Sequence, residues 1–466
     1  MKSFFVAQTI YIRLLHMVVF FLCFCAQAQE TFTKTQILSD MAYLKNTLEE
    51  AHYNLYAYTP KKEFDRNYEK VKQSVRKDSF NLLEATTLLQ RIISKANNGH
   101  TEIGFPGQSY GTYAYAGGTI FPLEIAFEDG KALVRKNWSG NDGIKIGSEI
   151  LAINGESMEQ ILTKIYPQLS AERPYFKNAK IELYSLPRLY WQVFGQIDSF
   201  TVEMVSEGKP ATYTLKAVDV IDGYEMKRNE VIASKMQLKF MGESAYLNPG
   251  GFGGDEAKYQ QFIDSCFTQI KAQKSKNLII DLRNNPGGND SFSDYLVSYF
   301  ADRPFTWYSH FSLKTSQVLK EHTRKHFDTT KTYFREILAH ENGTTYEPEL
   351  DFYQPQPKAK RFMGKVYVLV NRQSHSQSTV TAAQIQDYGF GTLVGEETGE
   401  FPTLYASQFQ FRLANTGITV NLSKGYSIRV NGSTKAEGVV PDIFIKDHLL
   451  DEQDEILNGL LARLQN

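Results

Sequence analysis

Apolar residues recur at three- and four-residue spacing through the first part of the chain that follows its N-terminal thirty residues. The stretches ILSDMAYLKNTLEEAH, FDRNYEKVKQSV and LLEATTLLQRIISKA all show this spacing. In a helix, such spacing places the apolar side chains on one face. Residues 30–100 are therefore predicted to form an N-terminal helical domain that ends at the motif NNGHT.

A β-rich domain is predicted over residues 110–220. FPLEIAFEDGKALVRKNW alternates apolar and polar residues on both sides of Glu128-Asp129-Gly130, which indicates a hairpin. GIKIGSEILAINGESMEQIL then predicts a turn, a strand and a helix that starts at Ser157. This order resembles a PDZ domain, which binds an extended peptide as an added strand. Ser148 stands where that family usually has Asp, and an unrelated β-module with a chance Ile-Asn-Gly turn is the alternative.

Buried strands and helices are predicted to alternate over residues 232–450. NLIIDLRNNPGG, VYVLVNRQS and TLVGEET each begin with an apolar run and end in a polar loop, and helical patterns lie between them. This alternation predicts an α/β domain, in which sites gather at the carboxyl ends of the strands. Residues 302–360 are polar and aromatic without a clear period. They are predicted to be an insertion that forms part of a substrate channel or lid.

The first 28 residues have the pattern of a secretory signal peptide. Lys2 and Arg13 precede an apolar run, and Ala26 and Ala28 supply an A-x-A-like site, so cleavage after Ala28 is expected. The run is shorter than the ~20 apolar residues of a spanning helix, which makes a membrane anchor the less favoured alternative. The protein is then expected in the periplasm or cell envelope of a bacterium, or outside the cell.

Composition excludes some classes of function. The 466 residues include 13% aromatic and 22% charged residues, which is typical of a folded protein with two or three domains. The net charge of −1 creates no field that favours nucleic acid or an anionic membrane. After cleavage only Cys266 would remain, so no internal disulfide is expected. The sequence has no CxxC or HExxH pair, and no metal or other cofactor is expected.

Two motifs contain a candidate base and a candidate anion site. His100 in NNGHTEIGF has the ordinary pKa of a general base near neutrality, although a histidine is more often a packing or surface residue. Gly287 and Gly288 in DLRNNPGG can expose backbone N–H groups to an oxyanion, or simply form a strand-to-helix turn.

Two further motifs contain a candidate nucleophile and a candidate acid. Ser376 in NRQSHSQS follows a strand and precedes a helix, whose N-terminus favours negative charge. The alternative is that Ser376 or Ser378 caps that helix. Glu437 in KAEGVVPDIFI can orient a histidine as the acid of a triad, or be a solvated carboxylate.

In their order, these motifs resemble one family over roughly residues 35–450. HT, DLRNNPGG, Ser-x-Ser before a helix and DYG, GE-x-TG and EG-x-x-PD resemble the tail-specific and C-terminal-processing serine peptidases, including the tricorn core and the interphotoreceptor retinoid-binding modules. The resemblance implies a ClpP/crotonase-like α/β core with an inserted PDZ domain. In that family the nucleophile lies eleven residues before the Asp of D-Y-G. Here that Asp is Asp387, which implies Ser376 and makes Ser374 a neighbour.

The family has two catalytic versions. One uses a lysine twenty-five residues after the serine, a position that is Phe401 here, and the nearest later lysine is Lys424 in a strand-like segment. The other version uses the histidine of a D-x-H-T motif and a late glutamate, to which His100 and Glu437 correspond. Asn98 stands where the family often has Asp, which puts the local support of the histidine in question.

The resemblance thus implies an exported serine endopeptidase that forms an acyl-enzyme on Ser376, with His100 as base and Glu437 as its orienting acid. The adjacent His375 is not expected to be the base, because neighbouring side chains usually diverge. The backbone N–H groups expected to bind the oxyanion are those of Gly287, Gly288 and Gln377. The expected partner is a peptide or unfolded protein and not nucleic acid, while homo-oligomerisation stays open. A non-catalytic binder on the same fold is the alternative, and the export signal opposes a crotonase-like acyl-CoA enzyme.

Overall fold

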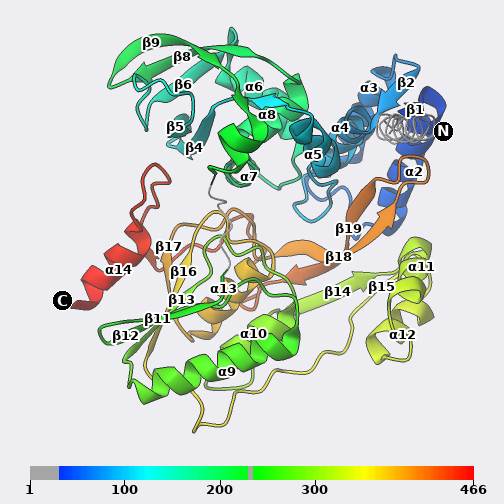
Figure 1. Cartoon of the computed structure of the whole chain (residues 1–466). Coiled ribbons are helices and arrows are strands. Elements are labelled where there is room, and N and C mark those ends of the chain that lie inside the picture. The colour runs from blue at the N-terminus through cyan, green and yellow to red at the C-terminus, as the bar shows by residue number, and fades with distance from the viewer. Residues whose placement is uncertain (1–30, 229–234, 466) are drawn as a thin grey trace, which may run out of the picture.

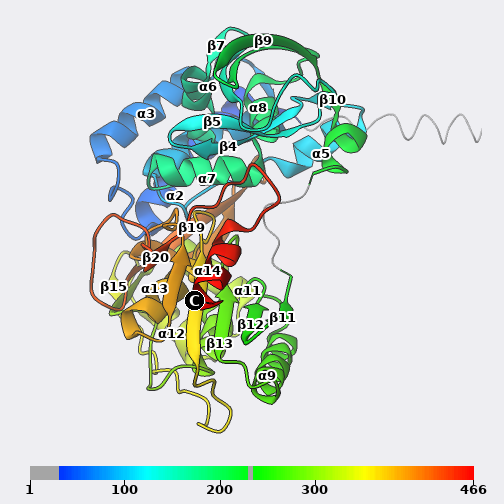
Figure 2. The same ribbon diagram turned by 90° about the vertical axis from the view of Figure 1, so that its left-hand side faces the viewer.

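The computed structural model describes residues 31–228 and 235–465, so the predicted signal peptide lies outside the described residues. Helices from the N-terminal part and a β-rich module occupy the upper half of Figure 1, and an α/β core occupies the lower half. Figure 2 shows the same two layers from the side, with α7 at their boundary. None of the helices in the described part of the chain is both long and apolar enough to cross a membrane.

The N-terminal part is helical, as its apolar spacing predicts. Its helices are α2 (Lys34–Ala51), α3 (Lys61–Gln73) and α4 (Leu82–Ile93). A capping box between Thr33 and Gln36 starts α2, and another between Asn81 and Glu84 starts α4, so each box satisfies backbone N–H groups that a helix start leaves free. The antiparallel strands β1 (Thr31–Thr33) and β2 (Ser79–Asn81) join the two starts.

These helices share their core with a hairpin that comes much later in the chain. The hairpin consists of β18 (Leu404–Arg412) and β19 (Thr419–Ile428). Buried side chains of α2 and α4 pack in one cluster with Phe409 and Leu422 of the hairpin. Asp40 of α2, fully buried, accepts hydrogen bonds from the turn of the hairpin, from the backbone N–H and side chain of both Asn415 and Thr416. The predicted boundary near residue 100 is therefore not a boundary of this core.

The β-rich module is an antiparallel sheet in the order β4-β5-β6-β8-β9, with β7 paired to β6. Its strands are β4 (Leu123–Glu128), β5 (Lys131–Asn137), β6 (Glu149–Ile153), β7 (Glu156–Ser157), β8 (Ser199–Ser206) and β9 (Lys209–Lys216). The predicted hairpin joins β4 to β5, and Asp129 and Gly130 both have positive φ, as a two-residue hairpin turn favours.

Helices α6 (Met158–Ile165), α7 (Pro174–Tyr184) and α8 (Leu186–Phe194) belong to the same module. Their buried side chains share one cluster with the sheet. Ser157 caps α6, as predicted. Helix α5 (Gly107–Tyr115) and the short pair β3 (Thr119–Ile120) and β10 (Val218–Asp219) flank the module where the chain enters and leaves it.

The predicted α/β core is confirmed. Its sheet has the order β11-β12-β13-β16-β17-β20, and it is parallel from β12 to β20. The strands are β11 (Gln237–Met241), β12 (Ser244–Asn248), β13 (Asn277–Asp281), β16 (Lys365–Val370), β17 (Thr392–Gly395) and β20 (Ile443–Phe444).

Both faces of this sheet are covered, which explains the continuous apolar runs of its strands. Leu278 and Ile280 of β13 pack in a cluster with side chains of α9 (Glu256–Ala272), α10 (Asp290–Ser298) and α13 (Gln377–Tyr388). Ile279 between them packs on the opposite face, against α14 (Glu455–Gln465).

The segment 302–360 contains regular structure that its sequence pattern does not show. Its elements are β14 (His310–Lys314), α11 (Gln317–His326), α12 (Thr332–Ala339) and β15 (Thr345–Tyr346). β14 pairs with β19 and extends the hairpin to a sheet of order β15-β14-β19-β18. The two helices are stabilised by tertiary contacts, because their buried Leu319 and Ile337 belong to the same cluster as α2 and α4.

Replacing Asp40 with Ala tests this shared core. The substitution leaves buried donors at the hairpin turn without an acceptor, so the free energy of unfolding should fall by roughly 2–4 kcal/mol. Glu69→Ala, at an exposed position of α3, is the control and should change it by less than about 0.5 kcal/mol. Urea denaturation followed by circular dichroism measures both. Equal stability of the two variants would contradict the shared core.

Candidate active site

Three loops meet at the carboxyl edge of the core sheet. They follow β13, β16 and β17, which are neighbours in the sheet, and comprise residues 282–289, 371–376 and 396–403. Because the strands are parallel, all three loops leave the same edge. Each loop contributes one part of the site described below.

Ser376 lies in a strained turn between β16 and α13. Its φ of 55° and ψ of −127° lie outside the regions that a non-glycine residue ordinarily adopts. It occupies the N-cap position of α13, but its side chain makes no capping hydrogen bond. Its Oγ instead lies 2.8 Å from Nε2 of His100. Neighbouring Ser374 and Ser378 both donate to the carbonyl of Leu282, so these two hydroxyls are structural.

His100 is held by contacts on both sides of it in the chain. Its ring is 3% exposed, and its carbonyl accepts a hydrogen bond from Nε2 of Gln408 at 2.6 Å. Asn98 accepts from Oγ of Ser423 at 2.8 Å and donates from Nδ2 to the carbonyl of Tyr405 at 3.0 Å. A carboxylate at position 98 has no proton to give to that carbonyl, so Asn supports this loop in a way that Asp would not.

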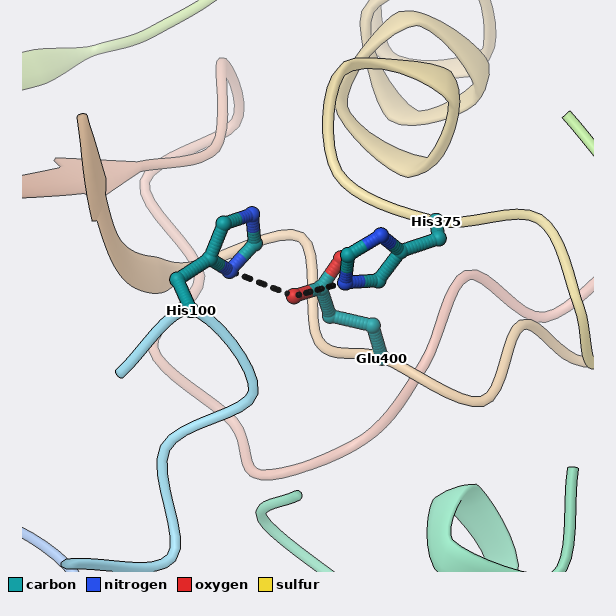
Figure 3. Close-up of side chains that lie close together, drawn as sticks. All are labelled: His100, His375 and Glu400. Atoms are coloured by element: carbon teal, nitrogen blue, oxygen red, sulfur yellow. Dashed lines mark ion pairs between the residues drawn. The ribbon is translucent and has the colours of Figure 1, made fainter. Parts of the chain in front are cut away.

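The carboxylate that contacts His100 belongs to Glu400, in the loop after β17. Its Oε1 lies 2.9 Å from Nδ1 of His100, and its Oε2 accepts the backbone N–H of Ser376. Figure 3 shows the His100 and His375 rings on either side of this one carboxylate. Nε2 of His375 lies 3.4 Å from the same Oε1. Glu400 is fully buried and thus fixes the histidine and the serine turn together.

Burial and charge oppose each other in this pair. Burial alone lowers the pKa of His100, but the charge of Glu400 outweighs it, so the pKa of His100 lies above its ordinary value. Burial alone raises the pKa of Glu400, but His100 and His375 hold it well below the ordinary range. Glu400 is therefore ionised near neutrality and stabilises a proton on His100.

Glu437 does not contact His100, so the predicted acid is wrong. Its side chain is 47% exposed, and its Oε1 lies 3.9 Å from Nζ of Lys435. It lies in the loop between β19 and β20, where water reaches its carboxylate. The sequence contains one indication that Glu400 is the acid. Glu400 directly precedes Phe401, the position at which the other catalytic version of the family has its lysine. Because the family's spacing at this position refers to a lysine, it does not point to a glutamate beside it.

Lys424, the other candidate base, contacts Ser407 and not Ser376. It lies on β19 with Nζ 2.8 Å from both the carbonyl and Oγ of Ser407. Burial lowers the pKa of Lys424 to about 8. Because Lys424 hydrogen-bonds to Ser407 and His100 contacts Ser376, the contacts favour the histidine version over the lysine version.

The glycine loop approaches the turn of Ser376 very closely. A Cβ on Gly287 would lie 2.6 Å from the backbone N of Gln377 and 2.7 Å from Cβ of Ser376, and Gly287 has φ of +83°. The N–H of Gly287 already donates to Oδ1 of Asn285, so it is not a free oxyanion donor as predicted. Gly288 and Gln377 remain as candidates, and both line the cavity at Ser376.

A cavity of about 830 Å³ opens at Ser376 and His100. The insertion 302–360 contributes an apolar part of its lining, and these side chains are Trp307, Phe311, Tyr333, Phe334 and Leu350. The insertion thus lines this cavity, and its part in a substrate channel or lid stays a prediction. Of the described residues, His100, His375 and Glu400 form a group whose donor atoms are close enough to hold a metal ion.

Comparison with known proteins identifies a peptidase family for part of the chain. Residues 243–445 match the family model "Peptidase family S41". We refer to these residues as the S41 domain, because they are the part of the chain that matches this family. The match confirms the predicted resemblance to the tail-specific and C-terminal-processing serine peptidases, and the S41 domain includes the three loops with Ser376 and Glu400, while His100 lies outside the matched range.

One curated relative and two solved structures are similar to this chain. The "Tail-specific protease" of Haemophilus influenzae is 27% identical over 189 residues, which are 39% of this chain and 22% of that protein. The chain thus matches less than a quarter of that relative. Mature CPAF, alone and in complex with lactacystin, has a TM-score of 0.65 at 15% identity. These matches cover 93% of this chain and 96–98% of CPAF, and they show a shared fold that extends beyond the S41 domain.

Gly287→Ala tests the close approach of the glycine loop. The added methyl group must displace the turn of Ser376, so labelling of Ser376 by a fluorophosphonate should slow by at least about tenfold. Gly343→Ala is the matched control, since Gly343 has φ of +84° but nothing within 4 Å of an added Cβ. It imposes the same backbone strain without the clash. Equal labelling rates, read by mass spectrometry, would contradict the proximity of the two loops.

Proposed function

We propose that this protein is a serine endopeptidase that cleaves peptides or protein tails through an acyl-enzyme on Ser376. The observation that supports this most directly is the distance of 2.8 Å between Oγ of Ser376 and Nε2 of His100, with Glu400 on the other ring nitrogen. Nucleophile, base and orienting acid are the three groups that this chemistry requires.

In the proposed reaction, Oγ of Ser376 attacks the peptide carbonyl while Nε2 of His100 takes the hydroxyl proton. Glu400 stabilises the resulting imidazolium, and the N–H groups of Gly288 and Gln377 bind the oxyanion. His100 then returns the proton to the leaving amine, and the C–N bond breaks. Water, deprotonated by the same histidine, hydrolyses the acyl-enzyme and restores the Ser376 hydroxyl.

The substrate that we propose is an unfolded segment with apolar side chains near the cleaved bond. The apolar lining from the insertion 302–360 would bury such side chains beside Ser376. The β-rich module would hold the peptide as an added strand, as PDZ-like modules do. A net charge of −1 on the whole chain favours neither acidic nor basic substrates.

A non-catalytic binder on the same fold is the second candidate. It requires no convergence of a serine, a histidine and an acid, and it would give no reason for the strained backbone at Ser376. The contacts of these three side chains therefore favour the peptidase.

Substitutions of the serine, the histidine and each of the two candidate acids test which residues form the triad. Ser376→Ala and His100→Ala should each lower kcat/KM by at least about 10,000-fold, and Glu400→Gln by about 100- to 10,000-fold. Glu437→Gln should stay within about twofold of the unchanged protein, because its side chain is solvated. The measurement is hydrolysis of a fluorogenic peptide library with apolar residues.

The pH profile adds a readout that misfolding does not mimic. The acidic limb of kcat/KM reports His100 in the free protein, and it should shift to lower pH in Glu400→Gln because the charge that raises the pKa of His100 is removed. Loss of activity in Glu437→Gln with an unchanged profile in Glu400→Gln would reverse the assignment of the acid.

Export is the remaining part of the proposal. Processing after Ala28 would release a chain that begins at Gln29, outside the cytoplasm of a bacterium. Expression in a bacterial host with fractionation should recover the protein from the envelope or medium, with an intact mass that corresponds to this start. Ala28→Arg should block processing and leave the longer mass. A full-length chain from the unchanged protein would contradict a cleaved signal.

A further inference from the structure

Two histidines share a single carboxylate oxygen in the S41 site, although a triad needs only one. His375 stacks on His100 with ring centroids 4.9 Å apart and planes 17° from parallel. Nδ1 of His100 and Nε2 of His375 both face Oε1 of Glu400, as Figure 3 shows. The proposed reaction gives His375 no task.

These three atoms lie close together but lack good hydrogen-bond partners. Each of them is buried, and none makes a hydrogen bond of acceptable geometry within the described chain. Nε2 of His375 is 3.4 Å from Oε1, which is long for a hydrogen bond, and Nδ1 of His100 meets the same oxygen as an ion pair at 2.9 Å. Buried polar atoms without partners are costly, so the cluster favours a ligand that satisfies all three.

We propose that His100, His375 and Glu400 bind one Zn²⁺ ion and that this ion reversibly inhibits the peptidase. Two imidazoles and one carboxylate are a common ligand set of zinc, which leaves a fourth position for water. The two histidines are not adjacent in the sequence, so the absence of a zinc motif there does not bear on this site.

The spacing of the donor atoms suits the ion. Bonds of about 2.0–2.1 Å to nitrogen and oxygen in a tetrahedral arrangement place the ligand atoms about 3.3–3.4 Å apart. The two distances to Oε1 are 2.9 Å and 3.4 Å, and all donor atoms of the group lie within 4.8 Å of one another. Small rotations of the two rings would complete the site.

Zinc at this position would disable the base by fixing its tautomer. A neutral imidazole that binds zinc through Nδ1 carries its proton on Nε2. The ring proton thus moves through solvent from Nδ1 to Nε2, and no net proton is gained or lost. Nε2 then has no lone pair for the hydroxyl proton of Ser376, so the serine cannot be activated. Inhibition in this sense rests on the proposed function, whereas binding of the ion does not.

The ion has a path to the site. The side chain of His375 is 26% exposed, and it lines both the main cavity and a second cavity of about 390 Å³ on the side of α7. His100 and Glu400 are buried behind it. His375 is therefore the ligand that zinc meets first and the one whose loss should separate zinc binding from the triad.

Calorimetric titration of the Ser376→Ala chain with ZnCl₂ tests the site without any need for activity. We expect one ion per chain at this site, and His375→Gln in the same background should weaken its binding by at least about tenfold. Zinc X-ray absorption on the Ser376→Ala chain should show two imidazole nitrogens in the first shell. This second measurement needs no ligand substitution and so does not depend on the folding of His375→Gln.

A surface pair supplies the matched control. His322 and His326 lie one turn apart on α11 with ring centroids at 4.7 Å, and such a pair can bind zinc weakly. Their double replacement by Gln should remove only a weaker second event. If it removes the principal binding event, or if His375→Gln binds zinc as tightly as its parent, the proposal is overturned.

The activity arm distinguishes the two proposals. Zinc should inhibit peptide hydrolysis by the unchanged protein, and a chelator should restore it. Zinc binding in a chain that hydrolyses no peptide would leave the metal site intact and contradict the proposed function. Full hydrolysis with zinc bound at His375 would contradict the inhibition, and absence of binding would contradict the site.

Discussion

The site depends on one fully buried carboxylate. Glu400 loses all contact with water, and a buried charge of this kind is tolerated only when groups of opposite charge or hydrogen-bond donors lie against it. Its two oxygens meet the ring of His100 and the backbone N–H of Ser376. The base and the nucleophile turn therefore cannot move independently of each other. The same carboxylate raises the pKa of His100, which burial alone would lower.

Residues outside the S41 domain also hold the base and the serine turn in place. Glu182 of α7 accepts hydrogen bonds from Arg372 and Gln373, which immediately precede the serine turn. Glu172 accepts the backbone N–H of Gly99, next to His100, at 2.7 Å. Burial, together with the charge of Glu400, raises the pKa of Glu172. Both carboxylates come from the β-rich module, so its position is coupled physically to the base and to the nucleophile.

Packing around Ser376 maintains its strained backbone conformation. Ser376 has a backbone conformation that costs of order 1–3 kcal/mol, and it persists because the glycine loop and α13 leave it no alternative. Replacing Gly287 with any larger residue would remove this fit, because the added Cβ would meet the turn of Ser376. His375 adds a second ring against Glu400, which is more than a serine triad requires. The proposed zinc site rests on this second ring.

The sequence by itself determined the α/β core and the order of its loops, because periodicity and short motifs are local properties of the chain. Ser376 and His100 were implied by its resemblance to a peptidase family and not by the local pattern, which also allowed a helix cap and a packing histidine. It did not identify Glu400, since the residue that approaches a histidine 300 positions away is set by which strands are neighbours, and β17 lies beside β16 only in the folded sheet. It also did not show that α11 and α12 are helices, because their stability comes from the core that they share with α2 and the hairpin. Glu437 fits the order of the family's motifs but is half-exposed, and only the tertiary structure decided which of the two carboxylates is buried against the base.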